Sequence, residues 1–198
     1  MYNGFTVRIG TPVCQEAATL LAKQLADLIT FGRAMLAGLL LWLGLTQRAE
    51  ALPLVCWLMI ADWMGDFLDG PIARRGCTAS HSWIGDHDLE VDIAVSFGLL
   101  LYLLAAGYVD LRIAAVYLLI WALVFWRWGV PRSLGMLIQA PIYGWFLWVA
   151  VREVPQAGGW VVAWILGMIV ITWPRFPREV VPVFLSGMRE AFEKYRHG

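Results

Sequence analysis

Charged residues are scarce in this chain of 198 residues. They make up 15% of it, whereas apolar residues make up 60%. A soluble domain of average composition carries about 25% charged and about 45–50% apolar residues. One soluble core of this size could not bury so much apolar surface. The composition therefore predicts an integral membrane protein.

Cysteine is equally scarce, and neither sign of charge is in excess. Cys14, Cys56 and Cys77 are widely spaced and form no C-x-x-C pair, which argues against a disulfide framework and a zinc site. Fifteen basic residues balance fifteen acidic ones, so nothing points to a nucleic-acid partner. The first 26 residues lack a basic start followed by a continuous apolar core, and we do not expect a signal peptide there.

Long apolar segments are what the sequence does contain. Each can form a helix of roughly 14–20 residues, which crosses a bilayer when slightly tilted or flanked by anchors. Polar or Gly- and Pro-containing stretches separate the segments. The six segments are Leu28–Leu45, Leu52–Phe67, Leu89–Ala106, Leu111–Phe125, Leu134–Val151 and Trp160–Trp173. The fold class expected is all-α, a polytopic membrane protein with six transmembrane helices.

Two flanking segments complete the predicted organisation. Residues 11–26 alternate apolar and polar side chains as an amphipathic helix on the membrane surface does. Residues 180–195 look similar, with basic residues towards their end. We therefore expect a membrane-surface segment over residues 1–26, a six-helix domain over 27–173 and a cytoplasmic amphipathic tail over 174–198. A structural anchoring role is the favoured interpretation of both flanks.

Basic residues predict the orientation, because loops rich in Lys and Arg stay in the cytoplasm. With the N-terminus inside, six spans return the C-terminus to the inside and place twelve basic residues on the inner side. Three remain on the outer side, namely Arg48, Arg112 and Arg152. The inner set is Arg8, Lys23, Arg33, Arg74, Arg75, Arg127, Arg132, Arg175, Arg178, Arg189, Lys194 and Arg196. Both termini are thus expected in the cytoplasm, in a bacterial-type inner membrane.

Acidic residues gather at the inner ends of the second and third predicted spans. Seven of the fifteen lie between Asp62 and Asp92. A carboxylate at membrane depth is costly, so it usually faces a wet cavity and has a function there. Asp62, Asp66 and Asp69 are spaced by four and three residues and therefore share one helix face.

Small residues extend that acidic face. It continues through Gly70 to Ala73, where a ligand could approach the backbone closely. Asp88 and Asp92 likewise share a face of the third span, at a spacing of four. Carboxylates so close would repel one another unless a cation neutralised them, and hard oxygen ligands suit Mg²⁺ or Mn²⁺. Two such ions could clamp the oxygens of a phosphate undergoing displacement.

These residues carry a resemblance to a known family. Asp66-Phe-Leu-Asp69-Gly70-Pro-Ile-Ala73-Arg74, followed by Asp88-x-x-x-Asp92, resembles the signature of the CDP-alcohol phosphatidyltransferases, D-x-x-D-G-x-x-A-R with a later G-x-x-x-D-x-x-x-D. Asp27-Leu-Ile-Thr30-Phe-Gly-Arg33 is similar to the family's N-x-x-T-x-x-R. The chain departs from the signature at Ile84, where the family has glycine. The resemblance covers about residues 27–173.

The resemblance implies an enzyme and a role for each matching residue. Such an enzyme moves a phosphatidyl group from CDP-diacylglycerol to an alcohol and releases CMP. By the resemblance, Asp66, Asp69, Asp88 and Asp92 hold two metal ions, Mg²⁺ or Mn²⁺, and Asp92 also acts as the base on the acceptor hydroxyl. The implied substrate contacts are Gly70 and Ala73 for the nucleotide and Arg74 for the diphosphate. A homodimer is also implied.

Other interpretations stay open from the residues alone. Arg127 and Arg132 could bind an acceptor phosphate, which would favour glycerol 3-phosphate or an inositol phosphate, but they also fit a plain excess of basic residues inside. Arg33 has the same two interpretations. Asp62 could be a further ligand or a hydrogen-bonded helix residue. The competing functions are a non-catalytic family member and a cation transporter, although a transporter usually has paired half-structures.

Overall fold

The computed structural model describes residues 12–74 and 88–174, together with residues 178, 182, 184–187 and 189. Side chains are described from residue 28 to 67 and from 89 to 174, and at the same isolated later positions. Predictions about residues 1–11, 75–87 and most of the tail therefore lie outside the described residues, as do those about the side chains of residues 12–27.

Every regular element in the described part of the chain is a helix, as expected. Within residues 12–74 and 88–174, six long helices and one 3-10 turn follow each other, and each predicted apolar segment falls on one long helix. The elements are α1 (Pro12–Thr46), η1 (Arg48–Ala51), α2 (Leu52–Arg74), α3 (Asp88–Ala105), α4 (Leu111–Trp128), α5 (Arg132–Glu153) and α6 (Pro155–Thr172).

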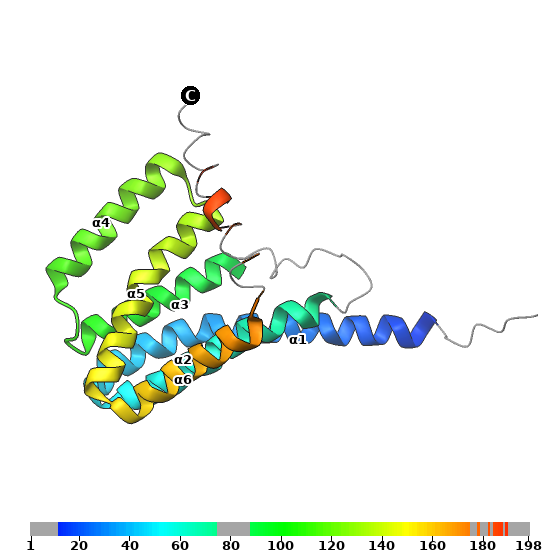
Figure 1. The fold of residues 1–198 in the computed structure, drawn as a ribbon, viewed down its shortest axis with the longest axis horizontal. Helices are drawn as coiled ribbons and strands as arrows, with labels where there is room; N and C mark the ends of the chain where they lie inside the picture. Colours follow the sequence, from blue (N-terminus) through cyan, green and yellow to red (C-terminus); the bar gives the residue numbers. More distant parts are fainter. Residues whose placement is uncertain are drawn as a thin grey trace, which may run out of the picture.

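Helix α1 is longer than its apolar segment. It begins at Pro12 and runs without interruption to Thr46, so the boundary expected at residue 26 lies inside the helix. Its first part extends beyond the other helices (Figure 1). The predicted surface segment is thus a helical continuation of the first apolar segment.

The exposed side of α1 is as apolar as its buried side. One stripe, spaced by three and four residues, is buried and ends in Leu36, Leu40 and Leu43. The opposite stripe is exposed and equally apolar: Leu28, Phe31, Met35, Leu39, Trp42 and Leu45. A helix that is apolar all round needs an apolar surrounding on its outer face, which for an outermost helix is lipid.

Four described helices are long and apolar enough to cross a membrane. They are Leu28–Thr46 within α1, then α4, α5 and α6. The chain is thus a helical membrane protein. Helices α2 and α3, which carry the acidic residues, are not in this group, and the six-span arrangement stays a prediction.

The core lies where α1, α2, α3, α5 and α6 meet. Helix α1 packs chiefly against α3, α5 packs against α6 and α3, and α2 packs against α1 and α6. Figure 1 shows α2 and α6 side by side. Large buried side chains come from all five helices, among them Leu40, Met59, Tyr102, Phe146 and Val161.

Helix α4 lies at the edge of this bundle (Figure 1). Its exposed apolar side chains include Ile113, Val116, Ile120 and Leu123. The hydroxyl of Tyr117 donates a hydrogen bond to the carbonyl oxygen of Ile138 on α5. That carbonyl belongs to the turn of α5 that precedes Pro141. Tyr117 thus links α4 to α5 at this turn.

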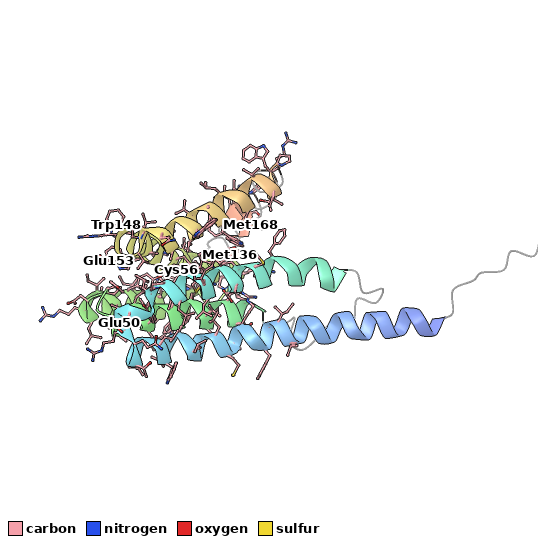
Figure 2. All side chains as sticks on the ribbon, turned by 90° about the horizontal axis from the view of Figure 1, so that it is seen from below. Glu50, Cys56, Met136, Trp148, Glu153 and Met168 are labelled. Atoms are coloured by element: carbon pink, nitrogen blue, oxygen red, sulfur yellow. The ribbon has the colours of Figure 1, made fainter. Side chains whose placement is uncertain are left out.

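Polar contacts close the end of the bundle opposite the overhang of α1. Glu50 and Glu153 both lie at this end in Figure 2. The loop after α3 is fastened there, because Nε1 of Trp145 donates to the carbonyl oxygen of Tyr108 at 3.0 Å. Burial raises the pKa of the Tyr108 hydroxyl, and the nearby Glu153 carboxylate raises it further. Asp110 then caps α4 by accepting from the backbone N–H of Arg112 at 2.8 Å.

Candidate functional site

The apolar core ends in a layer of charged side chains. On α1 the buried stripe of Leu36 and Leu40 continues to Arg33, which is 6% exposed. On α2 the stripe of Val55 and Met59 continues to Asp62, and on α3 the stripe of Val95 and Leu99 begins with Asp92. Because each charge extends a core stripe by one helical turn, packing of the three apolar stripes also brings the three charges together.

Arg33 is the centre of this layer. Its Nε donates to Oδ1 of Asp62 at 3.0 Å, and its Nη1 donates to Oδ1 of Asp66 at 3.2 Å. Its Nη2 donates to Oδ1 of Asp92. One guanidinium on α1 therefore joins two carboxylates of α2 to one of α3. The planar fork of arginine allows three partners in three directions, which a lysine ammonium could not match in this geometry.

Gly65 leaves the room that this arrangement needs. It lies on α2 between Asp62 and Asp66, facing α1. A β-carbon at Gly65 would lie 3.3 Å from Cγ2 of Ile29 and 3.7 Å from Cδ of Arg33. A larger side chain would push against Arg33, so the glycine lets α1 and α2 approach closely enough for the ion pairs.

The three carboxylates differ in their access to water. The side chain of Asp62 is 1% exposed, that of Asp92 is 26% exposed and that of Asp66 is 49% exposed. Asp62 is thus a buried partner of Arg33, which agrees with the interpretation as a hydrogen-bonded helix residue. Asp66 and Asp92 face the outside and can meet a ligand there.

Asp66 also lines an apolar groove. The groove has a volume of about 430 Å³ and lies between α2, α5 and α6. Trp63 forms its aromatic floor, in edge-on contact with Tyr143 at 5.5 Å and in tilted contact with Trp164 at 5.7 Å between ring centroids. The remaining lining residues are Phe67, Gly144, Leu147, Ile165 and Met168. Met168 is marked on α6 in Figure 2.

Tyr143 connects the groove to the charged layer. It lies within electrostatic range of Asp62, Asp92 and Arg33, and its ring is part of the groove wall. Of the described residues that line the groove, Asp66 is the charged one, and the others are mostly apolar. A ligand with an apolar chain and a charged head would fit such a lining.

The predicted site residues on α2 and α3 fall into two groups. The structure brings Asp66 and Asp92 together at Arg33. The other five lie on the last turns of α2 or at the first position of α3, and their side chains are outside the described residues. These five are Asp69, Gly70, Ala73, Arg74 and Asp88. The backbone of α2 remains helical through Pro71.

Arg127 and Arg132 flank the turn between α4 and α5. The guanidinium of Arg127 lies over the ring of Trp128, 5.7 Å from its centroid. Arg132 is the first residue of α5. The next turn of α5 packs on α3, because a β-carbon at Gly135 would lie 2.8 Å from Cδ1 of Leu89. Both arginines are thus at the end of the bundle where α3 begins, outside the Arg33 cluster.

Sequence reasoning missed the central position of Arg33 and the aromatic wall of the groove. A signal for Arg33 exists, because it is the one charged residue in the apolar segment Leu28–Leu45. A charge inside such a segment needs a partner at the same depth. The aromatic wall has no comparable signal, since Trp and Tyr are frequent throughout a membrane protein.

A metal ion would have to draw on residues beyond this cluster. Among the described side chains, no set of three or more His, Cys, Asp or Glu residues is close enough to hold one. Asp66 and Asp92 supply two carboxylates that are partly exposed. Asp69 and Asp88, one helical turn from Asp66 and Asp92, are the residues whose side chains could complete such a set.

Comparisons with known proteins do not identify the chain. No protein-family model matches it, and neither a curated protein nor a solved structure does.

Proposed function

We propose that this protein is a phosphatidyltransferase. It moves a phosphatidyl group from CDP-diacylglycerol to an alcohol and releases CMP, as a step in phospholipid synthesis. The observation that carries the proposal is the meeting of Asp66 and Asp92 at Arg33. These residues are the first and last aspartates of the motif that resembles the CDP-alcohol phosphatidyltransferases, and they come from different helices.

The donor set fits Mg²⁺ or Mn²⁺. Among the described side chains, three carboxylates and one guanidinium meet in the cluster, so these four carry an excess of negative charge. The ligands available are hard oxygens, without histidine or cysteine in the motif. Asp66, Asp69, Asp88 and Asp92 would hold the ions, two in number, as the resemblance implies. When bound, the ions supply charge neutralisation at the phosphate oxygens.

In the proposed reaction, the acceptor hydroxyl attacks phosphorus and must lose its proton. The oxygen of the acceptor hydroxyl forms a bond with the phosphorus of the phosphatidyl group. The bond between that phosphorus and the oxygen shared with CMP breaks. The hydroxyl proton passes to a carboxylate within reach, for which we propose Asp92. Its partial exposure, at 26%, gives an acceptor access to it.

The donor side consists of two parts. Gly70 and Ala73 extend the carboxylate face without bulk, and we propose that the nucleotide lies against them with Arg74 near the diphosphate. The groove beside Asp66 would take an acyl chain of the lipid. The groove favours CDP-diacylglycerol, a donor that carries acyl chains. Its apolar lining residues adjoin Asp66, where the phosphates of the donor would lie.

The membrane arrangement proposed is six spans with both termini and the active site in the cytoplasm. Helices α2 and α3 are spans as well, with their apolar outer ends in the bundle core and their acidic inner ends at the wet surface. A phosphorylated acceptor alcohol, such as glycerol 3-phosphate or an inositol phosphate, would meet Arg127 and Arg132. The family resemblance also favours a homodimer.

An assay of CMP release tests the proposal. Purified protein is incubated with CDP-diacylglycerol, Mg²⁺ or Mn²⁺ and a panel of alcohols that includes serine, glycerol 3-phosphate and inositol phosphate. We expect CMP release that depends on both the alcohol and the divalent ion and stops in EDTA. The Asp66→Asn and Asp92→Asn variants should lose at least ~10²-fold in rate, because phosphoryl displacement depends on positioning and charge neutralisation. Undiminished CMP release in EDTA, or by either variant, would contradict the proposal.

A further inference from the structure

The hydrogen bonds that Arg33 donates to Asp62, Asp66 and Asp92 are unequal. The partner of its Nε, Asp62, is 1% exposed, whereas the partners of its two terminal nitrogens, Asp66 and Asp92, are 49% and 26% exposed. We propose that Arg33 is a built-in counter-cation of the site, which competes with a divalent metal ion for Asp66 and Asp92, and that Asp62 holds Arg33 in place. This inference rests on the proposed function, because it takes the same two carboxylates as metal ligands.

The bond to Asp62 is the permanent one. Arg33 is 6% exposed and Asp62 is 4% exposed as whole residues, and both lie within apolar stretches of their helices. Separating them would leave two charges apart at membrane depth. Gly65 leaves room on α2 for the Arg33 side chain to reach Asp62, since even a β-carbon there would lie 3.7 Å from Cδ of Arg33. Arg33 therefore stays in the layer whether or not a metal ion is bound.

The bonds to Asp66 and Asp92 can be exchanged. Each uses Oδ1 of the carboxylate and a different terminal nitrogen of the guanidinium. Both carboxylates are partly exposed, so an ion can approach them from water without disturbing Asp62. A divalent ion attracts them more strongly than a single delocalised charge does. Without the ion, the positive charge of Arg33 offsets the repulsion between these two like charges.

Because of this arrangement, removing the charge of Arg33 and removing the charge of Asp62 should change the metal affinity in opposite directions. Removing the charge of Arg33 takes away a competitor and makes the site more negative, so a metal ion should bind more tightly. Without the charge of Asp62, the guanidinium of Arg33 interacts more strongly with Asp66 and Asp92. A metal ion should therefore bind these two carboxylates more weakly. A purely structural role predicts the same direction for both, because either change damages the same pair.

Mn²⁺ binding to the full chain without nucleotide or lipid substrate measures this directly. Free Mn²⁺ is followed by its electron paramagnetic resonance signal for the wild type, Arg33→Gln, Arg33→Lys and Asp62→Asn. We expect Arg33→Gln to bind Mn²⁺ at least ~10-fold more tightly and Asp62→Asn at least ~10-fold more weakly, as unit charges a few ångströms away require. Arg33→Lys should shift in the direction of Arg33→Gln by less, because an ammonium keeps the charge but lacks the fork.

The control is Glu90→Gln, which removes an exposed carboxylate near the start of α3. It should leave Mn²⁺ affinity within about twofold, because water screens an exposed charge. If Arg33→Gln fails to fold, the pair of Arg33→Lys and Asp62→Asn carries the same test. The thermal midpoint of each variant, with EDTA and with saturating Mn²⁺, gives a second measurement: the stabilisation by Mn²⁺ should increase for Arg33→Lys and decrease for Asp62→Asn.

Three results would overturn the inference: weaker binding in both kinds of variant, unchanged affinity in both, or no Mn²⁺ binding by the wild type at millimolar concentration. The CMP-release assay keeps the two proposals distinguishable. Opposite shifts in Mn²⁺ affinity in a protein that releases no CMP support the counter-cation and refute the transferase. Metal-dependent CMP release with shifts in the same direction refutes the counter-cation alone.

Discussion

Gly98 of α3 lies so close to Ala37 of α1 that a β-carbon on the glycine would be 2.6 Å from the carbonyl oxygen of Ala37. The same contact sets the spacing of the charged layer. Asp92 precedes Gly98 on α3, and Arg33 lies one helical turn before Ala37 on α1, so moving the two helices apart would also move Asp92 away from Arg33. Helix packing and site geometry thus depend on one missing side chain.

The first prediction follows from this contact. Gly98→Ala introduces a methyl group against backbone atoms, which can give way only if the helices separate. Such overpacking costs about 1–3 kcal/mol. We expect a lower thermal midpoint in detergent and a lower rate of CMP release.

The matched control is Gly38→Ala, on α1 beside Ala37, where a β-carbon meets nothing within 4 Å. Alanine is the better helix former, so this variant should be as stable as the wild type or slightly more stable. A Gly98→Ala protein as stable as Gly38→Ala would mean that α1 and α3 are not in close contact there.

The second prediction concerns the groove. A β-carbon at Gly144 meets nothing within 4 Å, so Gly144→Leu can fill the groove without disturbing α5. The variant should have a higher KM for long-chain CDP-diacylglycerol and an unchanged KM for a short-chain analogue, because only the long chain needs the groove. The comparison is made in mixed micelles at a constant surface fraction of lipid.

Gly159→Leu is the control for this substitution. Gly159 is exposed on α6, also with open space around it, and is not part of the groove. Gly159→Leu adds the same apolar side chain at an exposed position outside the groove. If both variants change the two KM values alike, the acyl chain does not lie between α2, α5 and α6.

Much of the fold could be predicted from the sequence, because long apolar segments separated by turn residues indicate where the helices lie. Each of the six segments falls on one helix. The spacing of Asp62 and Asp66, one helical turn apart, predicted that both lie on one helix face, and both accept hydrogen bonds from Arg33. The identity of that partner was not accessible from periodicity, because the position of Arg33 next to them depends on how α1 packs on α2 and α3.

The contacts that fix the packing were the least accessible. Gly65 and Gly98 are two of nineteen glycines, and their spacing does not distinguish them from Gly32 or Gly38, which face open space. The absence of a β-carbon affects the packing only where a neighbouring helix lies close to the glycine. The aromatic wall around Trp63 is of the same kind, since it is assembled from three helices.

The third prediction concerns the two motif aspartates whose side chains are outside the described residues. Asp69→Asn and Asp88→Asn keep the shape of the side chain and remove its charge. Each should lower the rate of CMP release by at least ~10²-fold and raise the Mn²⁺ concentration needed for half-maximal rate, because a metal site loses a ligand. Glu90→Gln, exposed on α3, is the control and should retain its activity. Wild-type kinetics in Asp69→Asn would remove Asp69 from the proposed ligand set.

The last prediction concerns the acceptor. Arg127 and Arg132 flank the turn between α4 and α5, at the end of the bundle where α3 begins. Arginine favours phosphate through its fork of donors. If the acceptor is a phosphorylated alcohol, the double variant Arg127→Gln and Arg132→Gln should raise the KM for the acceptor about 10-fold or more and leave the KM for CDP-diacylglycerol nearly unchanged, since one charged hydrogen bond contributes roughly 1.5–3 kcal/mol.

The control for the acceptor is a second double variant, Arg112→Gln and Arg152→Gln, which removes the same charge from the opposite end of the bundle. It tests whether a change in total charge alone alters the kinetics. Equal effects of the two double variants would point to a general electrostatic attraction of the anionic substrate. A clear preference for serine or for an uncharged alcohol would contradict a phosphate contact altogether. An effect confined to Arg127 and Arg132, and to the acceptor, would place the incoming alcohol on the side of the carboxylates from which its hydroxyl can reach Asp92.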